Sequence, residues 1–176
     1  MGQINFQPIT PYTGAHGGTG YYGGVYGVNH DGTVAGKAGA FSGTTVNGNV
    51  VGGAAGGIIT PNGSAAGGQA WIATPDGSQW AGAKGGIVDN PYMTAGEGAV
   101  AADTHKGSLA AGGAFAYDKV TGEFDAAGSA QWNNKSTGES HDASAQAALT
   151  KGLGGTVTVN KDGVEKIYTV PPRPTA

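Results

Sequence analysis

The sequence contains no cysteine, few charged residues and no long hydrophobic run. Without cysteine, the chain can form neither disulfide bonds nor thiolate metal sites, and it has no cysteine nucleophile. Its formal net charge is −3 and only 12% of its residues are charged, whereas disordered chains usually carry a large net charge. Because no run of about 18 apolar residues exists, a transmembrane helix is excluded.

Large hydrophobic residues are also scarce. Leu, Ile, Val and Phe together number 27 of 176 residues, whereas Ala numbers 28 and Gly 36. This fraction lies below the roughly 20% under which disorder has to be considered. Combined with the low charge, it favours either a flat, closely packed β structure or a chain that depends on assembly for its stability.

Nucleic-acid binding is disfavoured, and the N-terminal segment is not a secretory signal peptide. Nine basic residues and a pI of about 5.7 cannot supply a stripe that neutralises phosphates. The segment MGQINFQPITPYTG has neither the basic nor the apolar region of a signal peptide. We therefore expect a signal removed earlier, another export route, or assembly inside a cell as for virion parts.

Turn signals recur about every fifteen residues along the chain, and most combine Pro, Asn or Asp with Gly. The clearest are Pro61-Asn62-Gly63, Pro75-Asp76-Gly77 and Asn160-Lys161-Asp162-Gly163. Pro presets φ, Asn and Asp bond the nearby backbone, and Gly accepts the positive φ that follows. These signals predict hairpin reversals between antiparallel strands.

The segments between turns share one internal order, which is bulky, then small, then bulky. Val50–Ile59 reads VVGGAAGGII, and Leu109–Tyr117 reads LAAGGAFAY. Neither Gly nor Ala favours strands, so a central Gly/Ala stretch, the waist of each strand, requires another explanation. The waists predict close approach by another sheet, another subunit or a flat ligand.

These patterns predict an all-β fold, an antiparallel up-and-down meander of about ten long Gly/Ala-rich strands that forms a flat sandwich or flattened barrel. The alternative is a β-solenoid with coils of about 15 residues. We expect an extended N-terminal arm (1–18), one β-repeat domain (19–170) and a Pro-rich tail (171–176). Residues 139–152 have a helix-like composition, but their place in the repeat favours a strand. The segment 155–170 alternates as a conventional hairpin.

No motif indicates catalysis or a cofactor. The histidines, His16, His30, His105 and His141, are scattered without metal-ligand spacing. The G-x-G-x-x-G match at 18–23 lacks the strand and helix that a phosphate site needs. We therefore expect no enzyme activity, no cofactor and no metal.

Two sets of residues are candidates for interaction. Lys84 and Glu97 occupy neighbouring waists, nearly opposite each other, with Gln69 on the next strand, and a cross-strand ion pair explains them without catalysis. Aromatic residues lie near the strand ends, where they can form two small cores or an exposed surface for sugars or a neighbouring subunit. The candidate interaction surface comprises Tyr21, Tyr22, Tyr26, Trp71, Trp80, Tyr92 and Trp132.

The functional prediction is a non-enzymatic, self-assembling subunit of an extracellular fibre, matrix, surface layer or virion appendage, whose main partner is itself. Flat, weakly charged strands tend to pair with other strands, which supports this interpretation. The alternative is a glycan- or receptor-binding β domain of the lectin or adhesin kind, in which exposed aromatics and loop Asn and Asp residues contact the ligand.

Overall fold

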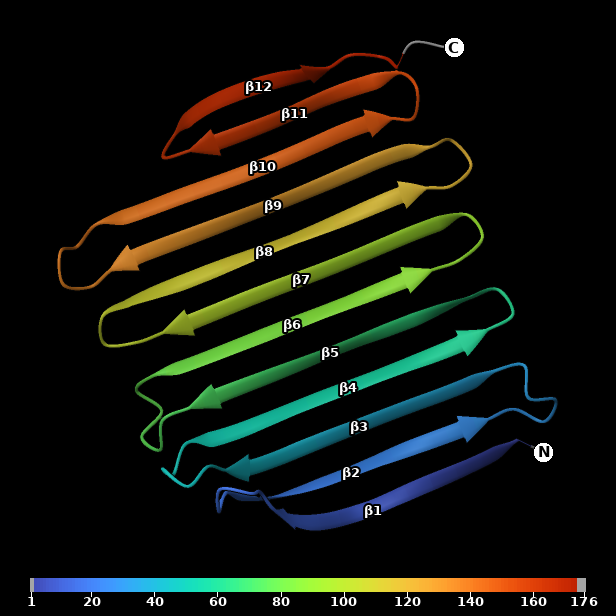
Figure 1. Cartoon of the computed structure of the whole chain (residues 1–176), viewed down its shortest axis with the longest axis vertical. Coiled ribbons are helices and arrows are strands. Elements are labelled where there is room, and N and C mark those ends of the chain that lie inside the picture. Colours follow the sequence, from blue (N-terminus) through green and yellow to red (C-terminus); the bar gives the residue numbers. More distant parts are fainter. Residues whose placement is uncertain (1, 174–176) are drawn as a thin grey trace.

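The computed structural model describes residues 2–173, and within them the chain forms one antiparallel sheet of twelve strands and no helix. The strand order in the sheet follows the sequence from β1 to β12 (Figure 1). The strands are β1 Gln3–Thr13, β2 Thr19–Val28, β3 Ala35–Thr44, β4 Val50–Thr60, β5 Gly63–Ala73, β6 Trp80–Asp89, β7 Met93–Asp103, β8 Gly107–Asp118, β9 Glu123–Asn134, β10 Ser140–Thr150, β11 Gly154–Lys161 and β12 Val164–Val170.

The predicted all-β meander is confirmed, with twelve strands instead of about ten. The sheet is open, because β1 and β12 lie at opposite edges and do not pair with each other. Every neighbouring pair is antiparallel, as hairpins require and solenoid coils do not. A second layer of a sandwich would therefore have to come from outside the described part of this chain.

Individual segments also agree with the expectations from sequence. Residues 140–150 form strand β10, which pairs with β9 and β11, so the position in the repeat outweighs the helix-like composition. The hairpin of β11 and β12 is formed as predicted. Its turn has positive φ at Asp162 (51°) and Gly163 (81°), the pattern of a two-residue type I′ turn.

The two ends of the chain differ in how they relate to the expectations. The segment 3–13, expected within an extended arm, is strand β1 and pairs with β2. Strand β12 ends at Val170, and residues 174–176 of the predicted Pro-rich tail lie outside the described residues.

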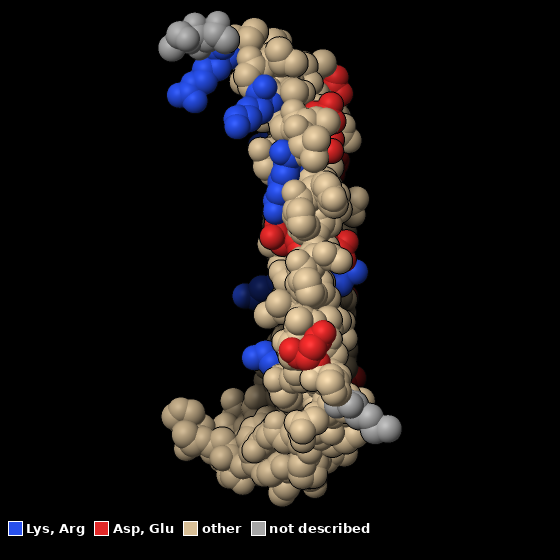
Figure 2. Space-filling view, turned by 90° about the vertical axis from the view of Figure 1, so that its right-hand side faces the viewer, with Lys and Arg blue, Asp and Glu red and all other residues tan. Residues whose placement is uncertain are grey.

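Residues 2–173 form a single layer without a core. Among the described residues, no hydrophobic or charged side chain is buried. Figure 2 shows this layer edge-on, with both ends of the sheet bending toward the same side. In the described part of the chain, the structure contains no helix that is long and apolar enough to cross a membrane.

Backbone hydrogen bonds join neighbouring turns along the two sides of the sheet where the strands end. Lys119 N–H donates to the Tyr92 carbonyl (2.7 Å), and Lys151 N–H donates to the Gly122 carbonyl (2.9 Å). Among the turns at the other ends of the strands, Lys135 N–H donates to the Lys106 carbonyl (3.0 Å). Each of these turns is thereby bonded to the preceding turn on the same side of the sheet.

Candidate interaction surfaces

The register of the strands assigns every strand residue to one of two faces, because directly paired residues share a face and successive residues alternate. One face, the apolar face, carries a central band of Gly and Ala between two rows of larger hydrophobic residues. The row near the β5–β6 turn contains Ile72, Val100, Leu109 and Trp132, and the row near the β6–β7 turn contains Ile59, Ile87, Phe115 and Phe124.

Charge is nearly absent from the middle of the apolar face. From β4 to β10 its only formal charge is Asp89, which lies at the end of β6. Lys119 Nζ donates to Asp89 Oδ1 (2.7 Å) and to the Asn90 carbonyl (2.7 Å), so this carboxylate is already paired. The other charges on this face are lysines of β3, β11 and β12: Lys37, Lys161 and Lys166.

The opposite face, the acidic face, changes character along the sheet. From β2 to β6 it is largely apolar, with Lys84 its only formal charge on these strands. From β7 to β12 it carries seven carboxylates together with Ser, Gln, Asn and Thr side chains. The seven are Glu97, Asp103, Asp118, Glu123, Asp125, Asp142 and Glu165. Figure 2 shows Asp and Glu mostly along one side of the layer and most Lys and Arg along the other.

Aromatic rings lie across glycines of the neighbouring strand, which explains the glycines near the strand ends. Trp71 of β5 pairs with Gly52 of β4, and a methyl group added to Gly52 would lie 2.8 Å from the Trp71 ring. Phe115 of β8 pairs with Gly96 of β7, where an added methyl would lie 2.7 Å from the ring. Such cross-strand contacts cover the glycine backbone and support the strand despite its missing side chain.

The seven predicted interaction residues are all exposed, but they do not form one surface. Their exposed fractions run from 39% for Tyr22 to 71% for Tyr92. Tyr21, Trp71 and Trp80 lie on the acidic face, in its apolar half. Tyr22, Tyr26 and Trp132 lie on the apolar face, and Tyr92 lies in the turn before β7.

The predicted pair of Lys84 and Glu97 shares the acidic face but is diagonal across two strands. Lys84 pairs directly with Ala99, and Glu97 pairs with Gly86. The turn is longer than the sequence suggested, because Asn90 Oδ1 accepts hydrogen bonds from the N–H groups of Tyr92 (2.9 Å) and Met93 (2.8 Å). Gln69 lies directly opposite Lys84, so the three polar residues do occupy one region of the sheet.

The histidines remain apart, and only His141 has a defined partner. Its ring stacks on Trp132 with centroids 5.4 Å apart, and its Nδ1 lies 3.1 Å from Asp162 Oδ2. The Asp142 N–H and His141 lower the pKa of Asp162. No group of three His, Asp or Glu side chains within residues 2–173 is placed to hold a metal ion.

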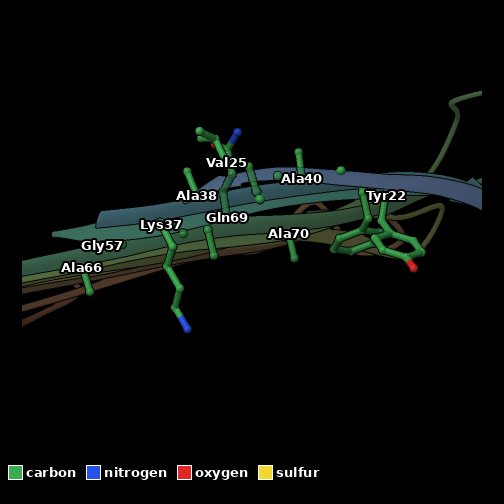
Figure 3. A pocket seen from close by; sticks show the side chains of 18 of the residues that line it. Tyr22, Val25, Lys37, Ala38, Ala40, Gly57, Ala66, Gln69 and Ala70 are labelled. Atoms are coloured by element: carbon green, nitrogen blue, oxygen red, sulfur yellow. The ribbon is translucent and has the colours of Figure 1, made fainter. Parts of the chain in front are cut away.

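A broad hollow over β1 to β6 is open sheet surface and not an enclosed site. Its lining comes from both faces, as Figure 3 shows: Val25, Ala38 and Ala40 point to one side of the ribbon, and Lys37 and Ala66 point to the other. Because the sheet is one layer thick, the same Gly/Ala waists form the floor on both sides. This geometry suits a flat, extended partner better than a small molecule, which proteins usually bind in concave sites.

Asp side chains hold the turns at the edges of the sheet. Asp76 Oδ1 accepts hydrogen bonds from Thr74 Oγ1 (2.6 Å), the Ser78 N–H (3.0 Å) and Ser78 Oγ (2.8 Å). These donors favour the charged carboxylate and lower the pKa of Asp76 to about 2. The loop Asp residues are thus used by the turns themselves.

Comparisons with protein-family models, with curated proteins and with solved structures find no match to this chain. Sequence reasoning missed the division into an apolar and an acidic face. The signal for it is the strict alternation in β9, where Glu123, Asp125 and Ser129 occupy one face and Phe124 and Trp132 occupy the other.

Proposed function

We propose that this chain is a non-enzymatic, self-assembling subunit of a structural element, namely a fibre, matrix, surface layer or virion appendage. It is located outside a cell or in a virion, and its main partner is another copy of itself. One observation carries the proposal: a twelve-stranded sheet that leaves both of its faces uncovered.

The exposed area supports this proposal quantitatively. A compact monomer of 17.2 kDa exposes about 7,800 Å² according to the usual scaling with mass. This chain exposes 11790 Å², an excess of about 4,000 Å². Burial of apolar area is the main favourable term in folding, so a chain with so much uncovered surface gains stability by covering it in an assembly.

Mass measurement and electron microscopy of the purified full chain test this proposal. Light scattering behind size exclusion, over a hundredfold range of concentration, should give masses well above 17.2 kDa. Negative-stain images should show regular particles or filaments. A chain that stays monomeric over the whole range would refute the proposal.

A second candidate function, glycan or receptor binding, is favoured by one specific arrangement. Trp71 and Trp80 lie on the same face of the adjacent strands β5 and β6, with exposed fractions of 43% and 45%. Flat, exposed indole rings of this kind can stack on sugar rings. Titration with glycans should quench tryptophan fluorescence in the wild type, and Trp71→Ala should reduce the binding while Trp132→Ala, on the other face, should not.

A further inference from the structure

We infer that the apolar face is the assembly interface and that its occupant is the apolar face of a second copy of this chain. This inference rests on the proposed function and specifies its partner and its surface. Four properties of the sheet support it: the blocked edges, the distribution of charge, the shape of the apolar face and the area that this face can bury.

The edges of the sheet are poorly suited to adding a strand. Edge strand β1 carries Pro8 and Pro11 and an irregular register between Gln7 and Thr10. Edge strand β12 is only 7 residues long, carries Glu165 and Lys166, and is followed by two prolines. Proline, bulges, charge and short length are the devices by which proteins prevent edge-to-edge pairing. Assembly is therefore directed to the faces.

The charges select which face is covered. If two acidic faces met, seven carboxylates from each copy would come together. An acidic face placed on an apolar face would bury carboxylates without partners, which is costly. Pairing two apolar faces over β4 to β10 keeps all seven carboxylates of each copy in water.

The surface shape of the apolar face is complementary to the same face of a second copy. On β8 the two hydrophobic rows are represented by Leu109 and Phe115, which are six residues or about 20 Å apart along the strand. Between them, Ala111 and Gly113 form a shallow groove. A copy related by a twofold axis and offset by about 10 Å along the strands places one of its rows in this groove and receives a row in return.

This arrangement buries enough area for a stable pair. Strands β4 to β10 at a spacing of about 4.8 Å, with about 23 Å of overlap after the offset, give about 750 Å² per copy or about 1,500 Å² in total. Specific stable interfaces bury about 1,200–2,000 Å².

Two adjacent alanines of β8 provide a matched test. Ala111 lies on the apolar face between Val100 and Ala130, whereas Ala110 lies on the acidic face between Ala101 and Gln131. Ala111→Lys places an unpaired charge in the interface, so the dissociation constant should rise on the order of 100-fold. Ala110→Lys adds the same charge to the solvated face and should change it less than about threefold.

The outcomes separate the two proposals. A wild type that stays at 17.2 kDa at every concentration would refute both the proposed function and this inference. Oligomers that persist in Ala111→Lys, or that are lost in Ala110→Lys, would overturn the choice of face and leave self-assembly intact.

A second readout does not require that the assembly be disrupted. Because the chain has no cysteine, the single variants Ala111→Cys and Ala110→Cys each carry one thiol. In the assembled protein, the thiol at 111 should react with a maleimide at least about tenfold more slowly than the thiol at 110, since burial limits access to the reagent. Equal rates in the assembled protein would overturn the inference.

Discussion

Substituting Gly52 tests whether cross-strand coverage by aromatic rings stabilises the sheet. In the variant Gly52→Ala, the new methyl would lie 2.8 Å from two ring carbons of Trp71 and 2.9 Å from its Nε1, so the ring has to move. Trp71 is 43% exposed, and its covered part amounts to about 140 Å² of a large aromatic side chain. Exposing half of this area costs about 1.8 kcal/mol at ~25 cal/mol per Å².

The replacement of Gly by Ala in a strand works in the opposite direction, by roughly 0.5–1 kcal/mol. The net expectation for Gly52→Ala is therefore a decrease of about 1 kcal/mol in the free energy of unfolding. The control is Gly27→Ala on the same face, where an added methyl meets nothing closer than 3.7 Å and φ is not positive. It should be neutral or stabilising by up to about 1 kcal/mol.

Urea unfolding followed by circular dichroism measures both variants at one protein concentration, because assembly makes stability depend on concentration. Tryptophan emission should shift to longer wavelength in native Gly52→Ala and not in Gly27→Ala. Equal stabilisation by both substitutions, without a shift in emission, would refute the coverage of Gly52 by Trp71.

Three further predictions concern the turns. The folded-state pKa of Asp76 is about 2, below its ordinary value of 3.8. Its carboxylate therefore stabilises the turn above pH ~4, and this stabilisation is lost as pH falls toward 2. Carboxyl ¹³C NMR titration should give a midpoint near 2, and a midpoint near 4 would contradict the hydrogen bonds described. Asp162→Val and Asp162→Gly both remove the carboxylate that accepts from the Asp142 N–H, but only Val is strained at φ of 51°, by about 1–2 kcal/mol. Thermal unfolding should show a lower midpoint for Val than for Gly, and equal midpoints would argue against the type I′ turn. Lys119→Met removes the ion pair with Asp89. Because both side chains are partly exposed, the loss of stability should be small and should disappear in high salt. A loss of stability that does not depend on salt would show that the ion pair is not its cause.

The meander could be predicted because its turns carry strong local chemistry. Asp162 and Gly163 specify a type I′ reversal by themselves, and the turn of Thr74, Asp76 and Ser78 closes through short side-chain hydrogen bonds. The strand at 140–150 was harder to predict, because Ala-rich composition favours a helix and only pairing with β9 and β11 decides for a strand.

The arrangement of the layers could not be predicted, since Gly and Ala waists fit one covered sheet or two facing sheets equally well. Lys84 and Glu97 were predicted to lie nearly opposite each other, and they do lie on the same face of adjacent strands. The Asn90 side chain lengthens the turn between them, so the two residues are diagonal neighbours and not a direct pair. The two faces could have been separated from the alternation in β9, which the bulky-small-bulky pattern obscured.

The strict sequential order of the strands has a mechanical consequence. The first and last strands form opposite edges of the sheet, and each strand is bonded only to its neighbours in sequence (Figure 1). A force that pulls the termini apart would therefore act on one edge strand at a time, and strands would peel away successively instead of shearing together. An isolated sheet should extend at low force in a series of small, equal steps and recover them in reverse order, which makes the chain a compliant spring until a second layer covers it.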